Sequence, residues 1–119
     1  GAVIVTTPQN VALLDSRKGL RMFQQLKVPV LGIIENMSYF IPPDMPSKQY
    51  DIFGSGGGSK TAAELEIPLL GCVPLEISTR VGGDNGVPIV VADTDSASAK
   101  ALKEIALAIA GKVSVAALT

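Results

Sequence analysis

Hydrophobic residues along this chain follow two kinds of pattern, short continuous runs and longer segments with helical spacing. The continuous runs carry no charge, as is typical of strands that are covered on both faces of a parallel sheet. They predict strands at residues 2–5, 28–34 and 69–73, and Pro74 is expected to end the last of them.

Two segments have the hydrophobic spacing of amphipathic helices. The first is predicted at residues 11–26, with Asn10 as its cap. The last is predicted to be capped by Asp95 or Ser96 and to end at Gly111, because glycine favours helix termination.

The remaining segments are shorter or irregular. Helical turns are predicted at residues 59–66 and 76–81, and a short extended piece at residues 88–91. Residues 37–53 contain Pro42, Pro43 and Pro46, so this long connection is expected to lack regular structure.

Strands that alternate with helices indicate βαβ units, and hence an α/β fold with a parallel sheet between helices. We expect residues 1–119 to form part of a single domain. The chain has no initial methionine and begins inside a predicted strand, so we expect it to be a fragment whose amino-terminal half is absent.

Composition narrows the functional classes. The net charge of −1 gives no electrostatic basis for binding nucleic acid or an anionic membrane, and no apolar run approaches the roughly 18 residues of a membrane span. Cys72 is the single cysteine, so an internal disulfide is excluded and a cytoplasmic location is expected. Histidine is absent, which removes the commonest general base and metal ligand. Cys72 itself is expected to pack in a strand as a small hydrophobic residue.

Asn36 is the first candidate site residue, because it follows directly on a buried parallel strand. Ligands of open α/β sheets bind outside the carboxyl ends of the strands. An asparagine amide offers a donor and an acceptor that match N7 and N6 of adenine. The local sequence alone also fits a turn residue at the end of a strand.

Residues 54–61, Gly-Ser-Gly-Gly-Gly-Ser-Lys-Thr, nearly match a phosphate-binding loop. Ser59 stands where that pattern requires its second glycine, and no buried strand precedes the segment. We therefore interpret it as a glycine-rich turn followed by an ordinary helix start.

Several motifs together carry a family resemblance. Residues 1–9 read Gly-Ala-Val-Ile-Val-Thr-Thr-Pro-Gln and residues 35–40 read Glu-Asn-Met-Ser-Tyr-Phe, followed by Asp-Ile-Phe-Gly at 51–54 and Ile-Pro-Leu-Leu-Gly at 67–71. In this order and spacing they resemble the carboxyl-terminal half of the Mrp/ApbC family, which are P-loop ATPases related to MinD and to nitrogenase iron protein.

The resemblance implies a Rossmann-like P-loop NTPase fold of three layers, ATP binding and hydrolysis with magnesium in the parent protein, and homodimer formation. It also implies iron–sulfur cluster carriage to apoprotein clients. By the same resemblance, Asn36 contacts adenine, and Pro74, Leu75 and Glu76 close over the other side of the base. Asp15 would lie near that site, where either an exposed ion pair with Lys18 or a dimer contact is expected.

Two departures from the family limit these implications. The phosphate loop and the switch aspartates are not among the 119 residues, so this chain alone is expected to have no ATPase activity. Pro42 and Met45 occupy the positions of a Cys-x-x-Cys pair, and neither replaces a thiolate as a cluster ligand. The alternatives are a MinD-like ATPase without a cluster and a non-catalytic interaction module.

Overall fold

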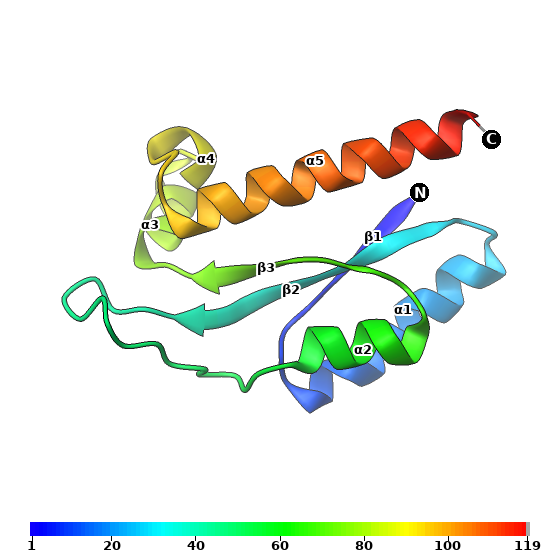
Figure 1. Ribbon diagram of the computed structural model, residues 1–119, viewed down its shortest axis with the longest axis horizontal. Coiled ribbons are helices and arrows are strands. Elements are labelled where there is room, and N and C mark those ends of the chain that lie inside the picture. Colours follow the sequence, from blue (N-terminus) through cyan, green and yellow to red (C-terminus); the bar gives the residue numbers. More distant parts are fainter. Residues whose placement is uncertain (119) are drawn as a thin grey trace.

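A computed structural model describes residues 1–118 as a three-stranded parallel sheet, in the order β1-β2-β3, with five helices (Figure 1). The elements are β1 (Ala2–Thr6), α1 (Asn10–Gln25), β2 (Val30–Phe40), α2 (Gly57–Leu65), β3 (Leu69–Leu75), α3 (Ile77–Asn85), α4 (Ile89–Ala92) and α5 (Ala97–Leu118). The predicted α/β class with a parallel sheet is confirmed.

The sheet lies between two layers of helices. Helices α1 and α2 cover one face, and α5 runs along the other face, where it packs against β3 (Figure 1). Helices α3 and α4 lie beyond the carboxyl ends of β2 and β3. This arrangement is a three-layer α/β unit, and ligands of such sheets bind outside the carboxyl ends of the strands.

The core forms between the sheet and the α1–α2 layer. Ile4 and Ile33, which are partners in the register of β1 and β2, pack with Leu20 of α1 and Ala62 of α2. Ile33 is fully buried. The hydrophobic runs that predict the strands therefore supply the centre of the core.

Strand β2 is longer than predicted. It passes through Glu35 and Asn36 and continues to Phe40, although its register with β3 shifts between Asn36 and Phe40. Met37 lies at φ +55°, in the left-handed region, so the strand is locally distorted where its register with β3 shifts. The backbone of Phe40 also forms an isolated antiparallel bridge with Tyr50, so the predicted irregular connection begins only after Phe40.

Pro74 does not end β3, contrary to the prediction, because β3 continues to Leu75. Strand β3 lies at the edge of the described sheet, where a proline without an N–H group removes no ladder hydrogen bond. The prediction of an extended piece at residues 88–91 is also wrong, since α4 forms there. The Pro88 carbonyl oxygen accepts hydrogen bonds from Val91 and Ala92.

The helix ends differ from the predictions in detail. Helix α1 begins at Asn10, and Gln9 occupies the cap position without a side-chain hydrogen bond. Ser96 caps α5 as predicted, since its Oγ accepts a hydrogen bond from the N–H of Ala99 at 3.0 Å. Helix α5 passes through Gly111, where it was predicted to end, and reaches Leu118, while Thr119 lies outside the described residues.

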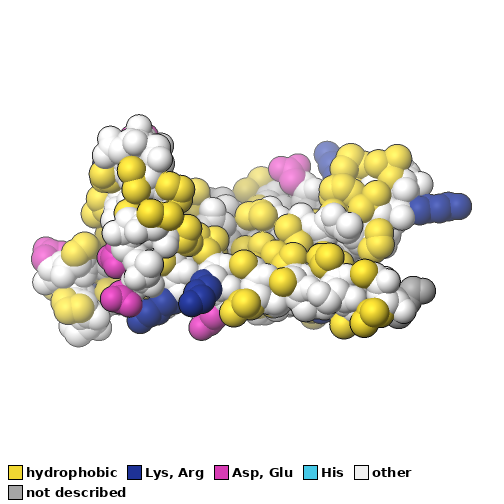
Figure 2. Space-filling model, turned by 90° about the horizontal axis from the view of Figure 1, so that it is seen from above, with side chains coloured by type: hydrophobic (Ala, Val, Ile, Leu, Met, Phe, Trp, Pro, Cys, Tyr) yellow, Lys and Arg dark blue, Asp and Glu magenta, His cyan; other side chains and the backbone are white. Residues whose placement is uncertain are grey.

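Helix α5 leaves much hydrophobic surface exposed. Figure 2 shows hydrophobic side chains along α5 and on the surface beside it. A hollow of about 670 Å³ lies between its carboxyl-terminal half and the start of β2, lined in part by Leu31, Leu107 and Val115. No helix within residues 1–118 is both long and apolar enough to cross a membrane.

Candidate functional site

Asn36 lines a recess of about 280 Å³ near the carboxyl end of β1, whose lining mixes apolar and polar residues. Thr6 and Thr7, at the end of β1, form part of its lining, and Asp15 and Ser16 of α1 form another part. The recess is therefore at the end of the sheet where ligands of open α/β folds bind. The sequence prediction that Asn36 reaches this end of the sheet is consistent with its position.

The Asn36 amide is oriented by its own backbone. Its Oδ1 accepts a hydrogen bond from the N–H of Met37 at 2.9 Å, across the left-handed residue that distorts β2. Because a backbone N–H needs an acceptor, this bond determines which end of the amide is oxygen. The Nδ2 group makes no hydrogen bond within residues 1–118 and remains a free donor.

Glu35 is a structural feature next to Asn36 that the sequence analysis missed. Its side chain is 6% exposed, and its Oε1 accepts a hydrogen bond from the N–H of Gly58 at 2.8 Å. The Ser38 hydroxyl donates to Oε2 at 2.5 Å. These bonds hold the distorted part of β2, on either side of Asn36, against the start of α2.

The glycine-rich turn is packed against the rest of the protein. A Cβ atom on Gly57 would lie 2.2 Å from the carbonyl oxygen of Pro8, in the loop between β1 and α1. The N–H of Gly58 is engaged by the Glu35 carboxylate, so a protein carboxylate already occupies the amino-terminal end of α2. Helix α2 does begin in this segment, at Gly57, two residues before the predicted start at residue 59.

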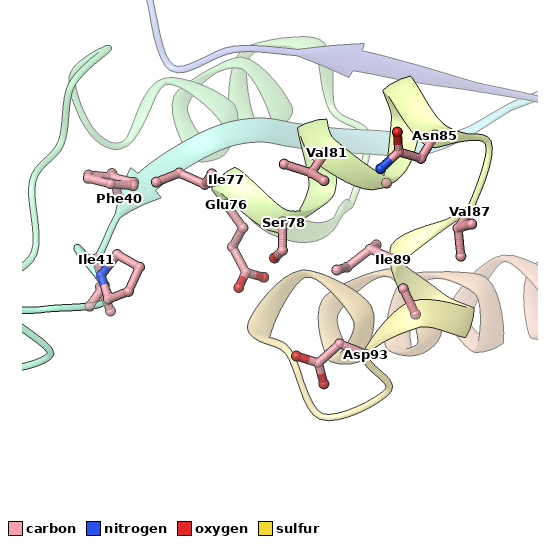
Figure 3. A pocket seen from close by; sticks show the side chains of 13 residues that line it. Phe40, Ile41, Glu76, Ile77, Ser78, Val81, Asn85, Val87, Ile89 and Asp93 are labelled. Atoms are coloured by element: carbon pink, nitrogen blue, oxygen red, sulfur yellow. The ribbon is translucent and has the colours of Figure 1, made fainter.

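Glu76 lines a different cavity from Asn36. This cavity has a volume of about 580 Å³ and is mainly apolar, with Phe40, Ile77 and Ile89 among its lining residues (Figure 3). Glu76 Oε1 accepts a hydrogen bond from the N–H of Ser98 at 2.6 Å. Its carboxylate therefore caps the amino-terminal end of α5.

Pro74 and Leu75 also lie apart from the recess around Asn36. Pro74 is buried, and its carbonyl oxygen accepts a hydrogen bond from the Ser98 hydroxyl. Leu75 lines a third, apolar hollow of about 280 Å³ together with Ile52 and Arg80. Pro74 and Leu75 thus lie at the end of β3, and Glu76 follows directly after it. Leu75 and Glu76 line the third hollow together, whereas Asn36 lines a different one.

Asp15 is exposed at the recess, and it forms no ion pair with Lys18 or any other cation within residues 1–118. The expected Asp15–Lys18 pair is therefore wrong. Helix α1 forms its ion pair through Arg17, which contacts Glu64 of α2.

Cys72 is exposed on the edge strand β3, contrary to the expectation that it packs as a buried hydrophobic residue. Partial burial of the thiol raises its pKa, a hydrogen bond with Ser38 lowers it, and the nearby Glu35 charge raises it. Residues 1–118 contain no group of three or more histidine, cysteine or acidic side chains that could hold a metal ion.

The loop after β2 carries the positions of the missing cysteine pair. The N–H of Met45 donates to the carbonyl oxygen of Pro42 at 3.0 Å, so these two residues are the ends of a tight turn. Ile41 and Met45 are exposed there. The loop presents hydrophobic groups to solvent and offers no thiolate.

Comparison with known proteins identifies the family. Residues 1–110 match the family model described as ParA, NUBPL iron-transfer P-loop NTPase. The chain belongs to this family. It is 73% identical over 118 residues to the iron–sulfur cluster carrier protein of Synechocystis, a match that covers 99% of this chain and 33% of the relative. The chain thus spans about a third of the length of this curated relative.

Two solved structures support the P-loop assignment. A nucleotide-binding protein from Archaeoglobus fulgidus, determined in complex with ADP, is 33% identical, with a TM-score of 0.66 over 82% of this chain and 38% of that one. The cell division ATPase MinD of Pyrococcus furiosus has a TM-score of 0.69 at 24% identity, over 93% of this chain and 43% of MinD. The expected resemblance to Mrp-like P-loop NTPases is confirmed, and the NUBPL-type chain has part of that fold.

Proposed function

We propose that this chain is the nucleotide-binding segment of an Mrp-like ATPase that acts in iron–sulfur cluster carriage in the cytoplasm. In this proposal it supplies the adenine pocket and part of a homodimer surface. ATP hydrolysis with magnesium belongs to the longer parent protein, because the phosphate loop is not among these residues.

The position of Asn36 carries the proposal. Asn36 lines a recess near the carboxyl end of β1, the end at which ligands of open α/β sheets bind, and its Nδ2 is free to donate. The chain belongs to a P-loop NTPase family, and a relative of similar fold was determined with ADP. A contact with the base would use this free Nδ2 donor. A residue that only ended a strand would not need a free side-chain donor.

The last two residues of β3, Pro74 and Leu75, and the following Glu76 are proposed to close over the other side of the base. The contact would be made by the backbone of Pro74, Leu75 and Glu76. The Glu76 side chain is already engaged, because its Oε1 accepts a hydrogen bond from the N–H of Ser98. The backbone of such a loop offers both donors and acceptors to a purine edge.

The dimer and client surface is proposed on the loop after β2 and its neighbours. Ile41, Met45, Tyr50 and Ile52 are all exposed hydrophobic residues of this connection. Exposed hydrophobic groups that gather on one surface indicate protein contact. A homodimer or an apoprotein client would bury them.

The iron–sulfur cluster is cargo in this proposal and not a resident cofactor of the segment. The described residues include one cysteine and no group of three potential ligands, so they do not fit a cluster held by this segment alone. Thiolates from other parts of the parent protein, or from a client, would be needed. This observation also favours a second candidate, a MinD-like ATPase that carries no cluster.

Titration of the purified chain with a fluorescent ATP analogue tests the nucleotide role. We expect saturable binding that Asn36→Ala weakens by about tenfold, the loss of one good base contact. Asn85→Ala is the matched control, because Asn85 lines the large apolar cavity. A loss of affinity in the Asn85 variant alone would place the base in that cavity, and absence of saturable binding would reject the proposed function.

A further inference from the structure

We propose that the large apolar cavity formed by the loop after β2, α3 and α4 binds an extended, basic peptide segment of a client protein. The inference rests on the client surface in the proposed function, and it names the chemistry of the client, which that function leaves open. The cavity is a different hollow from the recess around Asn36.

The cavity is lined by hydrophobic residues that a partner can reach. Its volume of about 580 Å³ is within the range of protein sites for organic ligands. Ile41 lines it from the loop, Val81 from α3 and Ile89 from α4 (Figure 3). Ile41 and Val81 are exposed, whereas Ile89 is buried. Hydrophobic side chains of a partner would therefore cover groups that now contact water.

A second apolar hollow adjoins this cavity. Its volume is about 280 Å³, and Phe40, Glu76 and Ile77 line both hollows, whereas Ile52 lines only the second. Residues i and i+2 of an extended chain point to the same side. Two adjoining hollows therefore suit two hydrophobic side chains that are two residues apart, which favours an extended peptide over a single small molecule.

Two carboxylates make the cavity negatively charged. Glu76 and Asp93 line it, and neither forms an ion pair within residues 1–118. One oxygen of Glu76 accepts a hydrogen bond from the N–H of Ser98, and one oxygen of Asp93 accepts from the N–H of Asp95. In the described part of the chain, the second oxygen of each carboxylate accepts no hydrogen bond. The lining residues include no lysine or arginine.

The charge of this part of the chain also favours a cationic partner. Residues 41–96, which include the loop after β2, α3 and α4, contain eight acidic and three basic side chains. The rest of the chain contains three acidic and seven basic ones. Complementary charges steer association, and like charges oppose it. A peptide with lysine or arginine beside its hydrophobic residues therefore fits the cavity, whereas the phosphates of a nucleotide do not.

Fluorescence anisotropy of three labelled peptides tests the inference on the purified chain. The probes are Ala-Lys-Leu-Ala-Leu-Lys-Ala, Ala-Glu-Leu-Ala-Leu-Glu-Ala and Ala-Lys-Ser-Ala-Ser-Lys-Ala, each with an uncharged fluorophore. We expect the first peptide to bind at least about tenfold more tightly than either of the others, because only it has both the basic and the hydrophobic groups.

Charge variants test the role of the two carboxylates. Asp93→Asn is expected to reduce the preference for the basic over the acidic peptide to about threefold, and its combination with Glu76→Gln to about one. Glu76→Gln keeps an oxygen acceptor for the N–H of Ser98. Asp95→Asn is the matched control, because Asp95 is exposed nearby in the chain and does not line the cavity. It is expected to keep the wild-type preference.

Val81→Ser tests the apolar contact and is expected to weaken binding of the basic peptide by about tenfold. Val91→Ser is its control, because Val91 is 71% exposed and lies outside the cavity lining. This control is expected to bind the peptide as the wild-type chain does. Circular dichroism checks that each variant is folded.

Equal affinity for the three peptides, a charge preference that survives the double variant, or equal effects of the two valine substitutions would overturn the inference. Displacement of the basic peptide by ATP would place a nucleotide in the cavity, and dissociation of a dimer by the peptide on gel filtration would place a second copy there; either result would overturn it. A chain that binds the fluorescent ATP analogue but no peptide rejects this inference alone. A chain that binds the basic peptide but not the analogue rejects the nucleotide role and supports this inference.

Discussion

The Glu35 carboxylate and the backbone N–H of Gly58 form a 2.8 Å hydrogen bond that joins the distorted part of β2 to the start of α2. Glu35 is buried without a basic partner among residues 1–118, and its second oxygen accepts from Ser38. The bond therefore connects the strand that carries Asn36 to a helix that begins much later in the chain, at Gly57.

Replacement of Glu35 by alanine is expected to lower the free energy of unfolding by about 2–3 kcal/mol. The substitution leaves the buried N–H of Gly58 and the hydroxyl of Ser38 without their acceptor. Urea denaturation followed by circular dichroism measures this change.

Glu35→Gln is the matched control, because it keeps an oxygen for Gly58 and gives Ser38 an amide donor. The loss of stability in this variant is expected to stay below about 1 kcal/mol. Equal losses in the two variants would contradict the assignment of the alanine effect to the missing acceptor.

Gly57→Ala is expected to destabilise the protein by about 1–3 kcal/mol, as overpacking does. The new Cβ atom would meet the Pro8 carbonyl at 2.2 Å, and a backbone oxygen has little freedom to move away. Gly19→Ala in the middle of α1 is the control, since a Cβ there meets nothing within 4 Å. That variant is expected to gain about 0.5–1 kcal/mol. A neutral Gly57→Ala would contradict the close packing of the two loops.

The strands were largely predictable from local pattern, because buried parallel strands are continuous hydrophobic runs. The end of β2 was not. Glu35, Asn36 and Ser38 are polar and therefore indicated a strand end, yet β2 continues to Phe40. What allows this is the N–H of Gly58, which lies 23 residues away and satisfies Glu35 inside the protein. Local hydropathy contains no information about such a partner.

The candidate site was predictable to a similar degree. The position of Asn36 directly after a hydrophobic run predicted that its side chain would lie near the carboxyl ends of the strands, where it lines the recess. Asp15 gave no comparable signal, because one acidic residue on an amphipathic helix is normally solvated. Its place beside Asn36 depends on the packing of α1 against β1, which only the structure shows.

The raised pKa of Cys72 predicts slow thiolate chemistry and a dependence of stability on pH. Alkylation by iodoacetamide at about pH 8, near the usual thiol pKa, is expected to be slower in the folded chain than in urea, because less thiolate is present. The stability that this thiol contributes is complete below the unfolded pKa of about 8.5 and is lost as pH rises through the higher folded value. Cys72→Ser is expected to lack this alkaline loss, and identical alkylation rates in both states would contradict the raised pKa.

The double substitution Pro42→Cys and Met45→Cys is expected to create a cluster site. The two positions end a tight turn, as the hydrogen bond between Met45 and Pro42 shows, so two thiolates there can bind one iron. Two chains would supply the four thiolates of a cluster. After anaerobic reconstitution with iron and sulfide, we expect a stable visible chromophore and a dimer on gel filtration for the double variant. The wild-type chain and each single variant serve as controls, and a chromophore of equal strength in the wild-type chain would show that other ligands suffice.

Glu76 provides the last prediction, because the family resemblance and the geometry suggest different roles for it. Its Oε1 caps α5 through the N–H of Ser98 at 2.6 Å, so Glu76→Ala is expected to lower stability by about 1 kcal/mol. Glu76→Gln keeps an oxygen acceptor and is expected to lose less. If the carboxylate only caps the helix, ATP affinity stays within about twofold of the wild-type value in both variants, within the range of indirect effects. A larger loss of ATP affinity in both variants, measured at a temperature where each remains folded, would instead assign the carboxylate charge to nucleotide binding.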